Sequence, residues 1–231
     1  MNFIKFFQNQ CMGCNCYLIN NDYICDKCIF GLKKNNRNSC YKCSRPLVND
    51  DLSLCVNCQK ETMYFEYGFS LYEYNDLMKK SIYNFKYNKK PEYAKFYASE
   101  IIKEYKDFIL KINPDCFVPI PLSNKKMILR GFNQAEVLAN EMSVLSGIKV
   151  VNLFKRIKHT SPMKNLTLFE RKRNLSEVFK LNKDKMILNN IKCVIIVDDI
   201  YTTGTTINYV SNILNSFGVK VYFITIAIAT I

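Results

Sequence analysis

The segment that most constrains the fold is 194–206, VIIVDDIYTTGTT, in which an apolar run ends at two adjacent carboxylates and a hydroxyl-rich loop. The run 194–197 is short, β-branched and uninterrupted, so it predicts a central strand that is covered on both faces. Asp198 and Asp199 would then lie at the carboxyl end of this strand, where open α/β sheets bind ligands. The segment therefore predicts an α/β fold with a ligand site at this edge of the sheet.

The loop after the two acids has the chemistry of a phosphate site. Four threonines surround one glycine, and a helix is expected to begin near Thr205. The N–H groups at a helix N-terminus favour a bound phosphate. A structural strand above a polar turn is the simpler interpretation, but a turn does not need four threonines. We therefore expect a site for a sugar that carries phosphates, with ribose hydroxyls on Asp198 and Asp199 and the phosphate on Thr202, Thr203, Gly204, Thr205 and Thr206.

Cysteine spacing predicts metal sites in the first quarter of the chain. The chain has 11 cysteines and no segment that looks like an export signal, which favours metal ligation over disulfides. Two C-x-x-C turns can supply the four thiolates of a tetrahedral, structural zinc site, which leaves no position open for catalysis. The paired cysteines are Cys11/Cys14, Cys25/Cys28, Cys40/Cys43 and Cys55/Cys58.

The sequence leaves the pairing of these turns open. Ten residues separate Cys14 from Cys25 and 11 separate Cys43 from Cys55, so two zinc ribbons in series fit short hairpins. An interleaved pairing, first turn with third and second with fourth, is the alternative. Cys16 is an alternative ligand beside Cys14, which we rank below the paired cysteines. A redox role ranks lower still, because no thioredoxin-like βαβ pattern surrounds any pair.

Length and composition allow two domains. With 231 residues, of which 48% are hydrophobic, the chain can fill one full core and still carry a small appended module. We predict a double zinc ribbon over 1–62 and an α/β domain over 65–231.

Further elements are expected between the cysteines and the loop. Alternating aromatic residues over 64–74 predict a strand or hairpin. Helical periodicity over 76–87 predicts a helix with Asp76 as its N-cap, and a second helix is expected from Pro91 to about Leu110.

The charge of the chain favours a polyanionic partner. Lys and Arg number 33 against 20 Asp and Glu, a formal net charge of +13. An AT-rich coding sequence, which favours Lys, Asn and Ile, explains part of the excess of lysine. It does not explain why the basic residues cluster in 125–130, 155–164 and 171–173. From these clusters we predict nucleic-acid contacts at Lys155, Arg156, Lys158, Arg171 and Arg173.

Neither a signal peptide nor a membrane span is expected. The first ten residues lack a long apolar core and a cleavage site, and the apolar run 219–231 is too short to cross a bilayer. We expect a cytoplasmic protein, and leave open a peripheral position at the inner membrane face.

The strand, the two acids and the Thr-Thr-Gly-x-Thr loop resemble the signature of type I phosphoribosyltransferases, which bind 5-phosphoribosyl-1-diphosphate (PRPP). The resemblance implies a three-layer α/β domain with a mainly parallel sheet, Mg²⁺ bound with PRPP, and Asp198 and Asp199 as the catalytic pair. In that family a loop after an earlier strand holds the diphosphate. Here 123–134 has the corresponding place, and Arg130, which is followed by Gly131, is the cation that we assign to it.

Taken together, the motifs resemble the ComF/ComFC family over nearly the whole chain. Besides the cysteine pairs and the two acids, the shared blocks are Phe85-Lys86-Tyr87, VPIPL at 118–122, RGFNQA at 130–135 and Arg171-x-Arg173-Asn174. The resemblance implies a role in natural transformation, on incoming single-stranded DNA, together with a DNA translocase or helicase and a recombination mediator. One departure is HTSPM at 159–163, which lacks a glutamine that family members commonly carry in the loop over the substrate.

Two functions follow from these patterns. In the first, a PRPP-binding module handles single-stranded DNA; in the second, an active phosphoribosyltransferase of nucleotide metabolism transfers to an unknown acceptor. We prefer the first, because no segment for base specificity is recognisable. A purely structural zinc adaptor is a third alternative.

Overall fold

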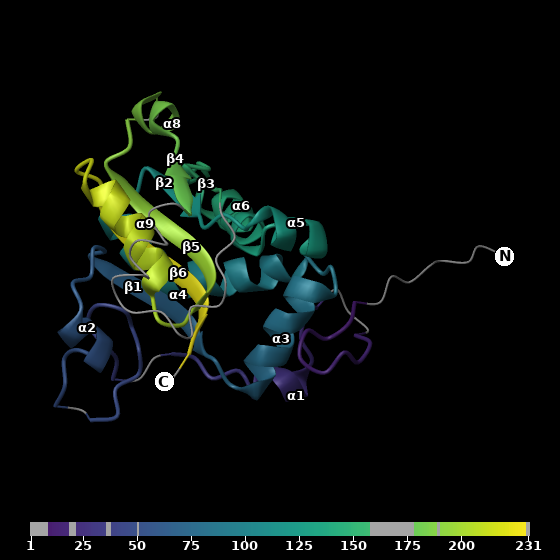
Figure 1. Ribbon diagram of the computed structural model, residues 1–231. Helices are drawn as coiled ribbons and strands as arrows, with labels where there is room; N and C mark the ends of the chain where they lie inside the picture. Colours follow the sequence, from purple (N-terminus) through teal and green to yellow (C-terminus); the bar gives the residue numbers. More distant parts are fainter. Residues whose placement is uncertain are drawn as a thin grey trace.

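Four parallel strands form the centre of the molecule (Figure 1). The computed structural model describes residues 9–18, 22–35, 38–49, 51–157, 178–188 and 190–229. The strands lie in the order β1-β6-β5-β2, and every neighbouring pair is parallel. Their bounds are β1 (Tyr67–Glu73), β2 (Cys116–Pro119), β5 (Cys193–Tyr201) and β6 (Lys220–Ile228). This arrangement confirms the predicted α/β class.

Helices and a short ribbon surround the sheet. The ribbon consists of the antiparallel strands β3 (Phe154–Arg156) and β4 (Phe179–Leu181). The helices are α1 (Asp26–Ile29), α2 (Val56–Lys60), α3 (Asp76–Tyr87), α4 (Tyr93–Ile112), α5 (Asn124–Arg130), α6 (Gln134–Ser146), α8 (Lys183–Leu188) and α9 (Thr205–Asn215). In the described part of the chain, none of them is both long enough and apolar enough to cross a bilayer.

Both faces of the sheet are buried, as the side chains of β5 show. Successive residues of this strand point to opposite faces of the sheet. Ile195 and Val197 belong to a hydrophobic cluster with residues of α3, α4 and α6. Val194 and Ile196 belong to a second cluster with residues of α9. These four side chains are fully buried. The result is three layers, as the uninterrupted apolar run predicts for a central strand.

Strand β5 does not end at the two acids. It continues to Tyr201, because β6 pairs with it as far as Tyr201↔Ile228. On its other side, the pairing with β2 ends at Pro119↔Val197. Asp198 and Asp199 therefore lie just beyond the end of β2, where β5 has a neighbour on one side only among the described strands.

Two boundaries differ from the sequence prediction. The N-cap of α3 is Asn75, whose side chain accepts a hydrogen bond from the Met78 N–H at 2.9 Å, so the assignment to Asp76 is wrong by one residue. Helix α4 begins at Tyr93, two residues after Pro91, which lies in the preceding turn. The aromatic segment forms the single strand β1, and it pairs with β6 in parallel.

The cysteine pairs pack on opposite faces of the sheet. Cys11 and Cys28 join the cluster of α3 and α4, whereas Cys40, Cys43 and Cys55 join the cluster of α9. Helices α1 and α2, which belong to the two halves of the cysteine region, are correspondingly far apart in Figure 1. Each half thus contributes to the core of the α/β domain. The boundary predicted between 62 and 65 stays a prediction.

Candidate functional site

The two acids of β5 have different partners. The Asp199 carboxylate accepts from the ammonium group of Lys86, on α3, at 2.8 Å. The two side chains are 14% and 13% exposed, so the ion pair is shielded from solvent. The Asp198 Oδ1 accepts from the Asp199 N–H at 2.8 Å. The Asp199 side chain is thus held by Lys86 of α3, and the Asp198 side chain is held by the backbone of the next residue.

The carboxyl group of Asp198 has a raised pKa. Its burial, together with the neighbouring charge of Asp199, raises the pKa of Asp198 from 3.8 to about 7. The positive charge of Lys86 opposes this rise. Burial and the charge of Asp199 thus favour the protonated form of Asp198, whereas a ligand that donates hydrogen bonds or brings positive charge favours its ionised form.

Cations gather around the acid pair from three elements. Burial lowers the pKa of Lys126 on α5, and the charges of Arg130 and Arg156 lower it further. Arg156, on β3, lies 5.4 Å over the Phe179 ring and interacts electrostatically with Asp198. The acids and these cations form a mixed site, in which an anionic ligand would compensate the excess positive charge.

Arg130 is more firmly held than the sequence prediction assumes. It is 5% exposed, and its guanidinium donates to Gln134 Oε1 at 2.8 Å and to the Tyr87 hydroxyl at 3.1 Å. Among the described residues, its buried Nε has no hydrogen-bond partner. Gly131 ends α5 with φ of 81° and so allows the turn predicted after Arg130. The role of Arg130 toward a diphosphate stays a prediction.

The predicted phosphate loop begins α9. Gly204 takes the N-cap position with φ of 77°, a conformation that favours glycine, and the hydroxyls of Thr203 and Thr205 lie 2.8 Å apart. Residues 202–207 line a small cavity of about 50 Å³ together with Asp198. The structure therefore brings the loop and the first acid of the pair to one cavity.

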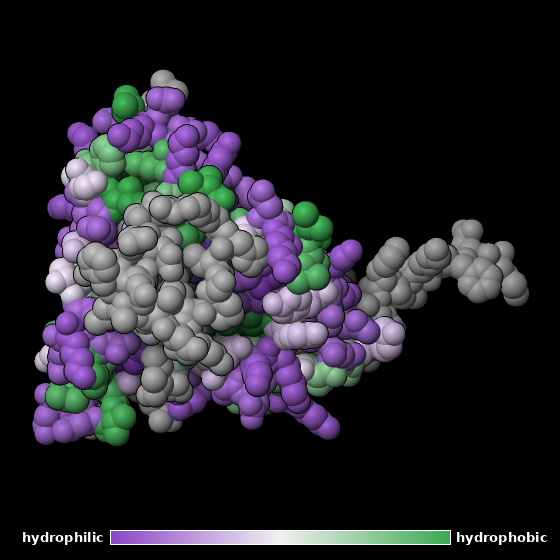
Figure 2. Space-filling model, viewed as in Figure 1, coloured by the Kyte–Doolittle hydropathy of each residue, from purple (hydrophilic) through white to green (hydrophobic). Residues whose placement is uncertain are grey.

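A larger hollow of about 420 Å³ lies between β2, α5 and β3. Two of its lining residues relate it to the acid pair: Arg156 interacts electrostatically with Asp198, and Pro119 pairs with Val197, the residue before Asp198. Its size is within the range of small-molecule sites. At the outer surface of α5, Ile128 and Leu129 are 85% and 64% exposed, and Figure 2 shows apolar side chains there beside hydrophilic ones.

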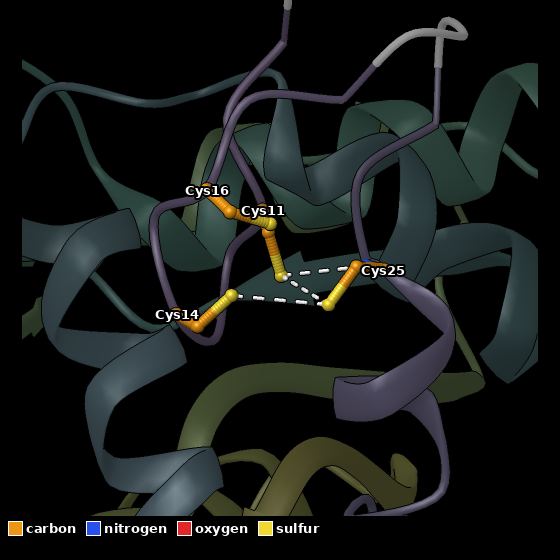
Figure 3. Close-up of side chains that lie close together, drawn as sticks. All are labelled: Cys11, Cys14, Cys16 and Cys25. Atoms are coloured by element: carbon orange, nitrogen blue, oxygen red, sulfur yellow. Dashed lines mark hydrogen bonds between the residues drawn. The ribbon is translucent and has the colours of Figure 1, made fainter.

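The first half of the cysteine region brings four thiols together (Figure 3). The sulfurs of Cys11, Cys14, Cys16 and Cys25 all lie within 4.8 Å of one another. Cys25 Sγ is 3.7 Å from Cys11 Sγ and 3.8 Å from Cys14 Sγ. Burial, followed by hydrogen bonds with neighbouring thiols, raises the pKa of Cys28, so this fifth cysteine also borders the group. The structure thus includes Cys16, which the sequence analysis ranked below Cys28.

The second half forms a group of Cys40, Cys43, Cys55 and Cys58. Cys43 Sγ lies 3.6 Å from Cys55 Sγ. Zn–S bonds of about 2.3 Å in a tetrahedron place sulfurs about 3.8 Å apart, and the distances in both groups fit this value. The residues therefore suit two structural zinc ions, and the serial pairing of the turns is confirmed over the interleaved one.

Two of the predicted nucleic-acid residues, Lys155 and Arg156, lie on strand β3 of the ribbon. Lys155 is exposed, whereas Arg156, the next residue, is half-buried and interacts electrostatically with Asp198. Lys180 on β4 pairs directly with Lys155 and is exposed as well. Lys158, Arg171 and Arg173 lie outside the described residues, as does His159.

Sequence reasoning missed two contributors to these sites. Lys86 appeared only within the triplet Phe85-Lys86-Tyr87, although a lysine beside two aromatic residues near the end of a helix was a usable signal. Lys180 gave no signal, because its relation to Lys155 depends on the pairing of β3 with β4.

A parallel sheet with an acid pair on its central strand, followed by a glycine-containing loop at a helix start, defines the fold of a type I phosphoribosyltransferase-like protein. No family model matches the chain. It is 28% identical to the competence protein ComFC of Bacillus subtilis over 204 residues, which cover 83% of this chain and 77% of that protein. It is 29% identical to ComFC of Streptococcus pneumoniae over 88% of this chain and 87% of that protein.

A shorter match links the chain to competence protein F of Haemophilus influenzae. The two are 35% identical over 108 residues, but these cover only 46% of this chain and 47% of that protein. Together with the longer matches, this similarity supports the ComF/ComFC family for this chain.

Proposed function

We propose that the protein binds PRPP together with Mg²⁺ and acts in competence, where it handles incoming single-stranded DNA beside a DNA translocase or helicase and a recombination mediator. The names of its relatives support the role in competence and DNA uptake. The observation that carries PRPP binding is the cavity shared by Asp198 and residues 202–207.

The loop is suited to the 5′-phosphate. Helix α9 has 11 residues, so its first N–H groups and its dipole favour an anion at this end. The hydroxyls of Thr203 and Thr205 already contact each other, and both can turn to donate to phosphate oxygens. A side chain at Gly204 would not fit, because its Cβ would lie 2.1 Å from the Tyr201 hydroxyl oxygen.

The acid pair is suited to the ribose and to a cation. Carboxylate oxygens accept hydrogen bonds from ribose hydroxyls and are ligands that Mg²⁺ prefers. Burial raises the pKa of Asp198, and a cation or hydrogen-bond donor bound beside this carboxyl group would favour its ionised form. Mg²⁺ would neutralise part of the diphosphate charge, and the ion pair with Lys86 would orient the Asp199 carboxylate.

Calorimetric titration of Mg²⁺-PRPP into the zinc-loaded full chain tests this proposal. Binding is expected for the wild type, and the double variant Asp198→Asn/Asp199→Asn should lose tenfold or more of the affinity, since at least one charged hydrogen bond is removed (about 1.5–3 kcal/mol). Ribose 5-phosphate should compete. No heat and no competition with the wild type would refute the PRPP site.

The ribbon β3–β4 is suited to a nucleic-acid backbone. Like charges directly opposite each other destabilise a strand pair, so the exposed pair Lys155 and Lys180 is best explained by a polyanionic partner. The double reversal Lys155→Glu/Lys180→Glu is expected to weaken binding of single-stranded DNA and to lower the salt slope by about two contacts. Reversing Lys95 and Lys103, both exposed on α4, is the matched control. Equal effects of both pairs would exclude a specific role of the ribbon.

Catalysis is the second candidate, and the hollow of about 420 Å³ beside the acid pair favours it. An acceptor nitrogen bound there would attack C1′ of the ribose, while the bond from C1′ to diphosphate breaks and the diphosphate leaves with the electron pair. The side chains would act mainly by positioning and by charge stabilisation. Diphosphate release with a panel of nucleobases and amines tests this candidate, and absence of release with all of them excludes those acceptors.

A further inference from the structure

The chain of the second cysteine group reaches the phosphate loop through one arginine. Arg45 follows Cys43 by two residues and is 7% exposed. Its Nη2 donates to the backbone carbonyl of Thr202, and its Nη1 donates to that of Ala229. The loop and the end of β6 are therefore joined by one buried guanidinium.

This contact fixes the direction of a peptide group in the loop. In a trans peptide, the C=O of one residue and the N–H of the next point in opposite directions. Because the Thr202 carbonyl points to Arg45, the Thr203 N–H points away from it. Arg45 thus determines which way the first donor of the loop faces.

Arg45 also packs beside the aromatic side chain on which the loop lies. The guanidinium carbon lies 5.8 Å from the centre of the Tyr201 ring, and this ring is stacked on Phe223 at 4.8 Å. Gly204 approaches Tyr201 so closely that no Cβ fits between them. The Tyr201 ring, with Arg45 beside it, therefore restricts the positions that the loop can take on this side.

The position of Arg45 depends in turn on the cysteines. The Cys40 N–H donates to the Arg45 carbonyl at 2.8 Å, and the Ser44 N–H donates to the Cys40 carbonyl at 2.9 Å. These bonds close the C-x-x-C turn from which Arg45 projects. A zinc ion that joins Cys40 and Cys43 to Cys55 and Cys58 would hold this turn, and with it the arginine.

We infer that Arg45 is a positioning residue that couples metal binding at the second cysteine group to the conformation of the phosphate loop. The inference rests on the proposed function for its consequence, which is that loss of this metal weakens phosphate binding. The first cysteine group lies on the other face of the sheet and should have no such effect.

Hydrogen exchange of the zinc-loaded full chain without PRPP tests the coupling directly. In Arg45→Met, the amides of Asn208 and Ala229, which donate to the carbonyls of Gly204 and Tyr201 at 2.8 and 2.9 Å, should exchange about tenfold faster, because a charged hydrogen bond that holds the loop is lost. Arg45→Lys, which keeps a donor, should restore part of the protection. Lys42→Met is the matched control, since Lys42 belongs to the same turn but donates to Phe65 and Glu66 carbonyls instead.

The metal arm compares Cys58→Ser with Cys14→Ser. The first should release the second zinc and expose the same amides, and the second should leave them protected. The inference is overturned if Arg45→Met retains both zinc ions and exchanges like the wild type, or if the two cysteine variants expose the loop equally. A wild type that binds no PRPP would refute the proposed function, whereas the exchange data decide the coupling alone.

Discussion

Replacing Asp198 by asparagine is expected to stabilise the protein above pH 7, although the residue lies in the candidate site. Asparagine has the same shape, and its oxygen can still accept from the Asp199 N–H. It cannot ionise, so it removes the free-energy cost of a charge in this environment. The substitution is therefore expected to raise the free energy of unfolding while it weakens ligand binding.

The magnitude follows from the pKa of the carboxyl group. In the folded protein it is about 7, against an ordinary value of 3.8. The folded state thus binds the proton more tightly than the unfolded chain, and stability falls as the pH rises from about 4 to 7. At about 1.4 kcal/mol for each pH unit, the cost reaches up to about 4 kcal/mol above pH 7 and is about 1–2 kcal/mol at pH 5.

Urea unfolding of the zinc-loaded protein at pH 5 and pH 8 measures this difference, with tyrosine fluorescence as the signal because the chain has 15 tyrosines and no tryptophan. Asp198→Asn should raise the free energy of unfolding more at pH 8 than at pH 5. Asp199→Asn is the control of opposite sign, since it leaves Lys86 without its ion-pair partner. An equal gain at both pH values, or no gain at pH 8, would refute the reasoning.

Three further predictions concern the loop and the metals. Gly204→Ala should destabilise the protein at least twice as much as Gly218→Ala, which costs about 1 kcal/mol, because both have positive φ but only Gly204 lacks room for a Cβ; equal urea midpoints would contradict this. A strong chelator should release two zinc ions per chain and lower the thermal midpoint, and a release of one or none would contradict the assignment of two sites. Cys16→Ser and Cys28→Ser should each retain zinc at the first group because the other thiol completes the set, while the double variant should lose that ion; loss in either single variant, measured by metal analysis, would show that the two are not exchangeable.

The sequence predicts the part of the site that is contiguous along the chain. Strand, acids and loop follow one another within 194–206, so local patterns were sufficient. The predicted end of this strand at the two acids is wrong, because the length of β5 depends on its pairing with β6, a strand that is distant in sequence. Lys86 and Arg45 reach the acids and the loop only through the topology, and no local pattern contains that information. The same holds for the separation of the two cysteine groups, since spacing favours a serial pairing of the turns but does not predict which face of the sheet each group covers.

The order of the strands has a consequence for how the chain folds. Strand β6 is the last described strand, yet it lies between β1 and β5 and pairs with both. The complete sheet therefore cannot form until the segment of β6 has been synthesised. Within the sheet, strand β1 pairs with this segment, which is more than 140 residues away in the sequence, as the pair Tyr67↔Tyr222 shows. Such distant pairing slows folding and leaves strand edges exposed in the nascent chain. Both cysteine groups, by contrast, need only residues close in sequence to bind metal, so they can become ordered before the sheet on which they later pack.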